Sequence, residues 1–120
     1  MANRLVVKCT WGTDGPERCN QAFTVAATAA ASGVPVSLWL TGEAAWLAVP
    51  GRAGDVVLPH AAPLADLLAT VLEAGQVTVC AQCAARRGLT VGDLVDGVRV
   101  AGSAVFVAES LEDGAQSLVY

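Results

Sequence analysis

The four cysteines are the residues of this chain whose side chains are the strongest candidates for reactivity or metal binding. Cys80 and Cys83 have CxxC spacing, directly after the β-branched run 76–79 and at the start of the alanine-rich segment 81–87. This order predicts a thiol where a strand ends and a helix begins. Unpaired N–H groups and the positive end of the helix favour a thiolate at that place. Cys80 is therefore the candidate nucleophile, and Cys83 lies one turn further along.

Several kinds of chemistry fit these cysteines. A thioredoxin-like redox pair is one, although the motif lacks Trp-Cys-Gly-Pro character and follows the third predicted strand. A zinc site would need Cys9 and Cys19 to complete four thiolates, but structural zinc usually takes two tight cysteine pairs and Cys9–Cys19 is a loose one. We therefore expect no metal and no other cofactor. The third possibility is a nucleophilic or sulfur-carrying thiol at Cys80, with Cys83 as bystander or resolving partner. Alternatively, all four are packed thiols that behave as small apolar residues.

Polar and small residues follow the other predicted strands. In an open parallel sheet, ligands gather at the carboxyl ends of the strands. Trp11 and Gly12 follow the first predicted strand, and Thr41 and Gly42 follow the second. Together with Arg86, they are the candidate substrate-binding residues.

Three further charged or titratable residues have two interpretations each. Arg86 and Arg87 either add positive potential near Cys80 or cap the end of a helix in solvent. His60, the single histidine, is either a solvated loop residue or a general acid or base that reaches the thiol. Glu43 stands at a predicted helix start, where a carboxylate complements the helix dipole.

The elements that position these residues alternate along the chain. Strands are predicted at 5–9, 35–40, 76–80, 98–100 and 116–119, and helices at 16–31, 41–47, 63–73, 81–87, 90–93 and 103–110. This alternation predicts one domain over residues 1–120, a three-layer α/β/α fold with a mostly parallel five-stranded sheet. Asp14 and Glu17 match a capping box for the helix 16–31, whose small apolar faces predict burial all round. Residues 49–63 form the long loop.

Composition excludes several classes of protein. Apolar residues make up 54% of the chain and charged residues only 15%, which excludes disorder and predicts a homo-oligomer that buries the apolar excess. The net charge of −4, with no basic stripe, argues against nucleic-acid binding. No apolar stretch reaches the roughly 20 residues that span a bilayer, so no membrane partner is expected. The apolar run 5–7 is too short for a signal peptide, which favours the cytoplasm and reduced cysteines.

The segment from Val79 to Gly88, Val-Cys-Ala-Gln-Cys-Ala-Ala-Arg-Arg-Gly, resembles the DsrE/DsrF-like family. In that family a strand ends in a cysteine, a short helix follows, and Arg-Gly or Arg-Arg-Gly closes it. The likeness extends over nearly the whole chain in layout, including Val-Ser-Leu-Trp-Leu-Thr-Gly at 36–42. The chain differs from the family's sulfur-relay proteins in its loop 49–63 and in the extra cysteines Cys9 and Cys19.

The resemblance implies a five-stranded parallel sheet between helices, assembled as trimers or hexamers. It also implies a sulfur-carrier or sulfurtransferase-like protein, in which Cys80 accepts sulfane sulfur as a persulfide and passes it to a partner thiol on a donor or acceptor protein. The alternatives are a non-catalytic, homo-oligomeric ligand-binding or regulatory protein of the same fold, or a CxxC redox protein.

Overall fold

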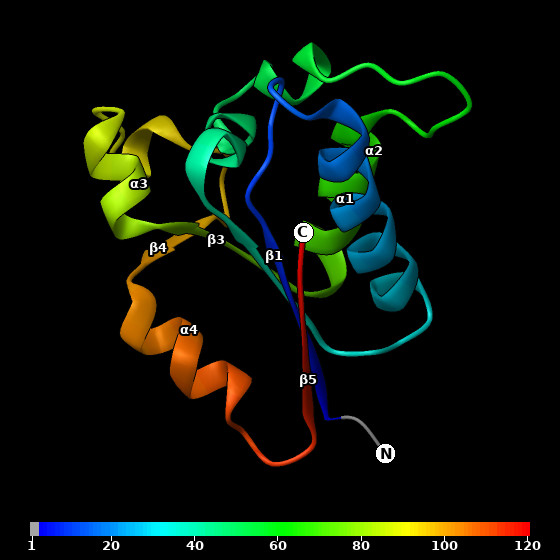
Figure 1. The fold of residues 1–120 in the computed structure, drawn as a ribbon, viewed down its shortest axis with the longest axis vertical. Helices are drawn as coiled ribbons and strands as arrows, with labels where there is room; N and C mark the ends of the chain where they lie inside the picture. Colours follow the sequence, from blue (N-terminus) through cyan, green and yellow to red (C-terminus); the bar gives the residue numbers. More distant parts are fainter. Residues whose placement is uncertain (1–2) are drawn as a thin grey trace.

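The computed structural model describes residues 3–120 and has one five-stranded sheet in the order β4-β3-β2-β1-β5, with every neighbouring pair parallel (Figure 1). The strands are β1 (Arg4–Cys9), β2 (Val36–Leu40), β3 (Gln76–Cys80), β4 (Arg99–Ala101) and β5 (Ala115–Val119). The α-helices are α1 (Pro16–Ala31), α2 (Leu64–Ala74), α3 (Ala81–Arg86) and α4 (Ser103–Ser110). Three 3₁₀ segments are η1 (Gly42–Ala48), η2 (Arg52–Asp55) and η3 (Val91–Asp93). The predicted α/β fold is confirmed, and its sheet is wholly parallel.

Helices cover both faces of the sheet. In Figure 1, α1 and α2 lie on one side of the strands, and α3 and α4 lie on the other. All five residues of β2 are buried, because this strand is central in the sheet and covered on both faces. The main core lies between the sheet and the α1/α2 layer, and it includes Val7, Phe23 and Leu38.

On the other face of the sheet, α4 does not pack through an apolar core like that of α1 and α2. Its single buried residue is a carboxylate, Glu109. One carboxylate oxygen accepts hydrogen bonds from Ser37 Oγ at 2.6 Å and Trp39 Nε1 at 3.0 Å. The other accepts one from Arg99 at 2.7 Å and lies 3.5 Å from Arg4. This helix is therefore attached to the sheet by polar contacts around Glu109 and by the Phe106 ring, whose centroid lies 5.3 Å from that of Trp39.

Three details of the sequence-based interpretation are wrong. No capping box starts α1, because Asp14 instead accepts a hydrogen bond from the Gly12 N–H within the preceding turn. Burial of α1 is not all round, since its buried residues follow the helical repeat along one side. The long loop 49–63 contains a 3₁₀ turn, η2.

The ends of the elements otherwise lie close to the predicted positions. A short helical segment does form at the predicted position near Thr90, and it begins with a capping box in which the Thr90 N–H donates to the Asp93 carboxylate at 2.8 Å. In the part of the chain that the structure describes, no helix combines the length and apolar character required to cross a membrane.

Candidate functional site

Cys80 stands at the junction of β3 and α3. It is the last residue of the strand and the N-cap of the helix, in an extended conformation. The β-branched residues of β3 favour the strand, and Ala81 and Ala84 favour the helix that follows. Cys80 is only 8% exposed, as is Cys83. Both thiols therefore sit at the carboxyl edge of the sheet, close to the surface but mostly covered.

Cys83 connects α3 to the loop after β2. The Gly42 backbone N–H donates a hydrogen bond to Cys83 Sγ at 3.2 Å. Gly42 has φ +55°, a conformation that glycine adopts without steric cost. Because an added Cβ on Gly42 would lie 3.0 Å from the Thr10 carbonyl oxygen, this loop also approaches the end of β1 closely. We call Cys80, Cys83 and Gly42 the thiol site.

The loop after β1 supports the thiol site through close backbone packing. A Cβ added to Gly12 would lie 2.6 Å from the Glu43 carbonyl oxygen, so glycine is required for this approach. Thr41 is buried and lies between the two loops, with its hydroxyl donating to the Cys9 carbonyl at 3.3 Å. The structure thus brings Gly12, Thr41 and Gly42 together beside Cys83.

Trp11 and Arg86, the other two candidate binding residues, point elsewhere. The Trp11 ring packs beside Gly15 and under the Arg18 guanidinium, whose carbon lies 4.7 Å from the ring centroid. Trp11 is therefore a packing residue at the start of α1. Arg86 is exposed on the last turn of α3.

Arg87 is the arginine that contacts the site. Its guanidinium donates to the Glu43 carboxylate at 2.8 and 3.2 Å and to the Cys83 carbonyl at 3.2 Å. Glu43 is thus an ion-pair partner that joins η1 to the end of α3. The sequence analysis named Arg86, and not Arg87, as a candidate binding residue. Which of the two reaches the site is decided by where η1 packs, and this has no signal in the sequence of a short helix.

The surroundings of Cys80 lower the pKa of its thiol. Burial acts against the thiolate, but the backbone N–H groups of Cys83 and Gln82, the Cys83 side chain and the Lys8 ammonium together outweigh it. The sulfur makes no complete capping hydrogen bond to α3, so the N–H groups act chiefly through their dipoles. A lowered pKa is one feature that reactive thiols in proteins share.

Lys8 is the residue that sequence reasoning missed. It is the single lysine of the chain and lies within β1. A lysine in a strand otherwise composed largely of apolar residues was the available signal. Its proximity to Cys80 was hidden, because it depends on the order in which β1, β2 and β3 join the sheet.

Cys9 and Cys19 form a separate pair in the core. Both are fully buried, and the Cys9 thiol donates to the Trp11 carbonyl at 3.1 Å. The hydrogen bond to Cys9, followed by burial, raises the pKa of Cys19 well above its usual range. Among residues 3–120, no three His, Cys, Asp or Glu side chains converge as metal ligands.

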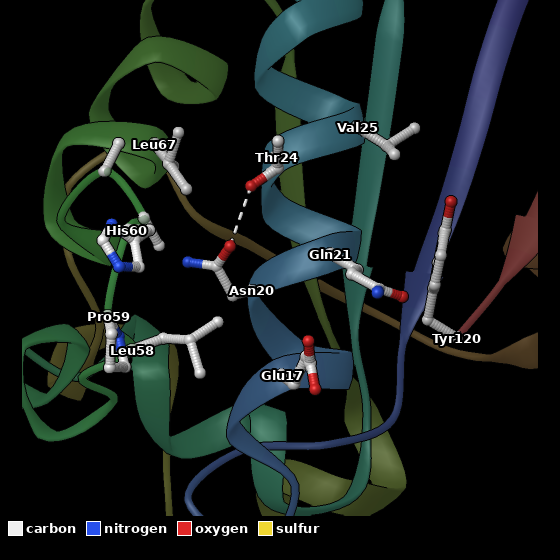
Figure 2. A pocket seen from close by; sticks show the side chains of 12 residues that line it. Glu17, Asn20, Gln21, Thr24, Val25, Leu58, Pro59, His60, Leu67 and Tyr120 are labelled. Atoms are coloured by element: carbon white, nitrogen blue, oxygen red, sulfur yellow. Dashed lines mark hydrogen bonds between the residues drawn. The ribbon is translucent and has the colours of Figure 1, made fainter.

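His60 lies in a different part of the molecule, in a pocket of about 620 Å³ between α1 and the segment 58–62 (Figure 2). Figure 2 shows the Asn20 amide nitrogen directed toward His60 across this pocket, with Leu58 and Leu67 beside them. No cysteine lines the pocket. The structure therefore does not bring His60 to the thiol site.

Comparison with known proteins assigns the chain to a family. The model of the DsrE/DsrF-like family matches residues 4–118, nearly the full length. The chain belongs to the DsrE/DsrF-like family. No curated protein matches its sequence.

Solved structures with the DsrE/DsrF-like fold of this chain include proteins from three organisms. The ychN protein from E. coli has a TM-score of 0.78 at 17% identity, with 100% of each chain covered. MTH1491 from Methanobacterium thermoautotrophicum has a TM-score of 0.71 at 15% identity, with 98% of each chain covered. BT1422 from Bacteroides thetaiotaomicron has a TM-score of 0.63 at 17% identity, covering 98% of this chain and 95% of the other. At these identities the likeness concerns the fold alone.

Proposed function

We propose that this DsrE/DsrF-like protein is a sulfur carrier that holds sulfane sulfur on Cys80 as a persulfide and relays it to a partner thiol. The observation that carries the proposal is the placement of Cys80. Its thiol lies at the strand–helix junction, among groups that lower its pKa. A thiolate is the form that attacks sulfane sulfur. The position matches the cysteine of the family's relay proteins, as the sequence resemblance implies.

Loading would proceed as thiol–persulfide exchange. The Cys80 thiolate attacks the terminal sulfur of a donor R–S–SH, a new S–S bond forms to Cys80, and the donor S–S bond breaks. The donor leaves as the thiolate R–S⁻, which takes the bonding electron pair, and the proton stays on the transferred sulfur. Transfer to an acceptor thiolate is the same exchange with Cys80 as the leaving group, so neither step needs a metal or an outside oxidant.

The test is mass spectrometry of the reduced protein after incubation with glutathione persulfide. Wild type is expected to gain one sulfur atom per chain, on the peptide that contains Cys80. Cys80→Ser should gain none, whereas Cys9→Ser, as a matched control at the end of another strand, should load normally. Loading of Cys80→Ser to the wild-type level would refute the assignment.

A dithiol redox protein is the second candidate, favoured by the contact between the Cys80 and Cys83 side chains. In that case Cys83 would attack a Cys80 persulfide, release hydrosulfide and leave a Cys80–Cys83 disulfide. Loading separates the two functions. A carrier keeps the added sulfur in wild type, whereas a redox dithiol keeps it only in Cys83→Ser.

We further propose that the protein functions as a homo-oligomer, a trimer or a multiple of it, in the cytoplasm. Apolar side chains are exposed on α4, at its C-cap and on β5, and the two elements contact each other. They are Val105, Val107, Leu111, Leu118 and Val119, which we call the α4–β5 patch. A second copy would bury this patch and cover β5, which is an edge strand.

A further inference from the structure

Lys8 lies on the face of the sheet that carries α4. Val7 and Cys9, its neighbours along β1, belong to the core on the α1/α2 side, so the alternation of a strand places Lys8 on the opposite face. Its ammonium lies over the ring of Phe106 from α4, 4.6 Å from the centroid, which is cation–π distance. Lys8 is half-buried there.

The register of the sheet places Lys8 near Cys80. Lys8 is opposite Trp39, Trp39 is opposite Thr78, and Cys80 is two residues beyond Thr78 on the same face of β3. The two side chains are therefore two strands apart and one row apart along the strands. The positive charge of Lys8 acts across this space on the Cys80 sulfur.

Arg86 on α3 is exposed to solvent, whereas the half-buried charged groups around Cys80 occur as mutually bonded pairs. Arg99 on β4 bonds to Glu109 on α4, and Arg87 after α3 bonds to Glu43 on η1. Among residues 3–120, by contrast, no carboxylate lies within ion-pair distance of Lys8. Within the described residues, Lys8 is thus the half-buried cation of these elements that no carboxylate neutralises.

The Phe106 ring compensates part of the desolvation of the Lys8 ammonium, and a nearby anion would stabilise the charge further. Two ionisable groups that the structure describes on this face could supply the anion, and Glu109 is already paired with Arg99, which leaves the sulfur of Cys80. We propose that Lys8 is a positioning residue of the thiol site, whose ammonium is the counter-ion of anionic sulfur on Cys80, first the thiolate and then the persulfide. The persulfide half of this inference rests on the proposed function.

The proposal explains how a mostly covered thiol remains reactive. Burial alone would keep Cys80 protonated, and the short helix α3 supplies only part of the compensation. Lys8 is on a different element, so its contribution can be removed without altering the CxxC segment. The role requires the charge and not the particular shape of lysine.

The test compares Lys8→Met, which keeps an unbranched side chain of nearly the same length but removes the charge, with Lys8→Arg, which keeps the charge. The rate of iodoacetamide modification at Cys80 is measured against pH by mass spectrometry of the peptide. For Lys8→Met we expect the midpoint to rise by about 0.5–1 pH unit and the rate at pH 7 to fall about three- to tenfold. The plateau rate at high pH should be unchanged, and Lys8→Arg should stay close to wild type. An unchanged midpoint in Lys8→Met, or an equal shift in Lys8→Arg, would overturn the proposal.

A second measurement uses the intact side chain, in case Lys8→Met fails to fold. Because the chain has one lysine, ¹³C-lysine labelling gives the NMR signal of one ε-methylene. This signal should shift with pH at the same midpoint as Cys80 modification, and the shift should vanish in Cys80→Ser. If the shift persists in Cys80→Ser, Lys8 does not sense the sulfur and the proposal fails.

Sulfur loading separates this inference from the proposed function. If the Cys80 midpoint depends on Lys8 but glutathione persulfide loads no sulfur, the sulfur-carrier function fails and the thiolate counter-ion stands. If sulfur loads normally and the midpoint is independent of Lys8, the carrier function stands and the counter-ion fails.

Discussion

The backbone N–H of Gly42 and the sulfur of Cys83 are 3.2 Å apart and hydrogen-bonded, which joins the loop after β2 to the helix after β3. Because Cys83 Sγ accepts this bond, Cys83 has a structural contact that Cys80 lacks. A Cys83→Ser variant keeps an acceptor at this position, so it tests the chemistry of the thiol without removing the contact. Cys83→Ala would remove both.

We predict that Gly12→Ala destabilises the protein by about 1–3 kcal/mol, because its Cβ would lie 2.6 Å from the Glu43 carbonyl oxygen and backbone must move to relieve the overlap. Urea unfolding measures the change. Gly54→Ala is the matched control, since its Cβ would meet no atom within 4 Å, and a change within about 0.5 kcal/mol is expected. Equal effects of the two substitutions would contradict the close approach of these loops.

We predict that Glu109→Ala lowers the free energy of unfolding by about 3–5 kcal/mol, because the substitution leaves Arg99 and Trp39 without their buried partner. Glu109→Gln should cost less, since its amide oxygen can still accept from Ser37 and Trp39. Glu112, the exposed carboxylate 3.6 Å from Arg4, provides the control, and Glu112→Gln should cost at most about 1 kcal/mol. If denaturant unfolding shows a larger loss of stability in Glu112→Gln than in Glu109→Ala, this account of how α4 is attached is wrong.

Glu109 also predicts a dependence of stability on pH. Burial opposes its ionisation, but hydrogen bonds from Ser37, Arg99 and Trp39 and the charge of Arg99 lower its pKa below the usual 4.5. A carboxyl whose pKa is lower in the folded state contributes stability above its unfolded pKa, and that contribution is lost as the pH falls through the folded pKa. The free energy of unfolding should therefore decline below about pH 4.5, and this decline should be shallower in Glu109→Gln. If the free energy of unfolding falls equally steeply with pH in wild type and in Glu109→Gln, this prediction is refuted.

We predict that light scattering at micromolar concentration returns the mass of a trimer or a multiple of it. Substitution of Val107 by Asp within the α4–β5 patch should lower that mass, because a carboxylate cannot be buried unpaired in an interface. Val57→Asp is the control, since Val57 is also an exposed valine but lies outside the patch. A monomer mass for wild type would contradict the oligomer, and an equal loss in Val57→Asp would exclude the patch as its interface.

The cysteines show how much of the thiol site could be predicted from the sequence. The β-branched run before Cys80 and the alanines after it determine a strand and a helix by local propensity, so the junction and its thiol were predictable. The same holds for the alternation of strands and helices, which requires a parallel sheet. The partners of Cys83, by contrast, are long-range contacts, since Gly42 is brought to it by the packing of η1.

The failed capping box at Asp14 and the unforeseen placement of Lys8 near Cys80 have one cause. Spacing along the chain records which side chains are neighbours within an element, and this information sufficed for the strands, the helices and the position of Cys80. The tertiary structure alone decided that Arg87, and not Arg86, bonds to Glu43. It also decided that Asp14 accepts a hydrogen bond within its own turn, and that β1 lies two strands from β3. Strand order and layer packing are determined by the burial of whole faces, so single residues carry no local signal of which charge will face the thiol.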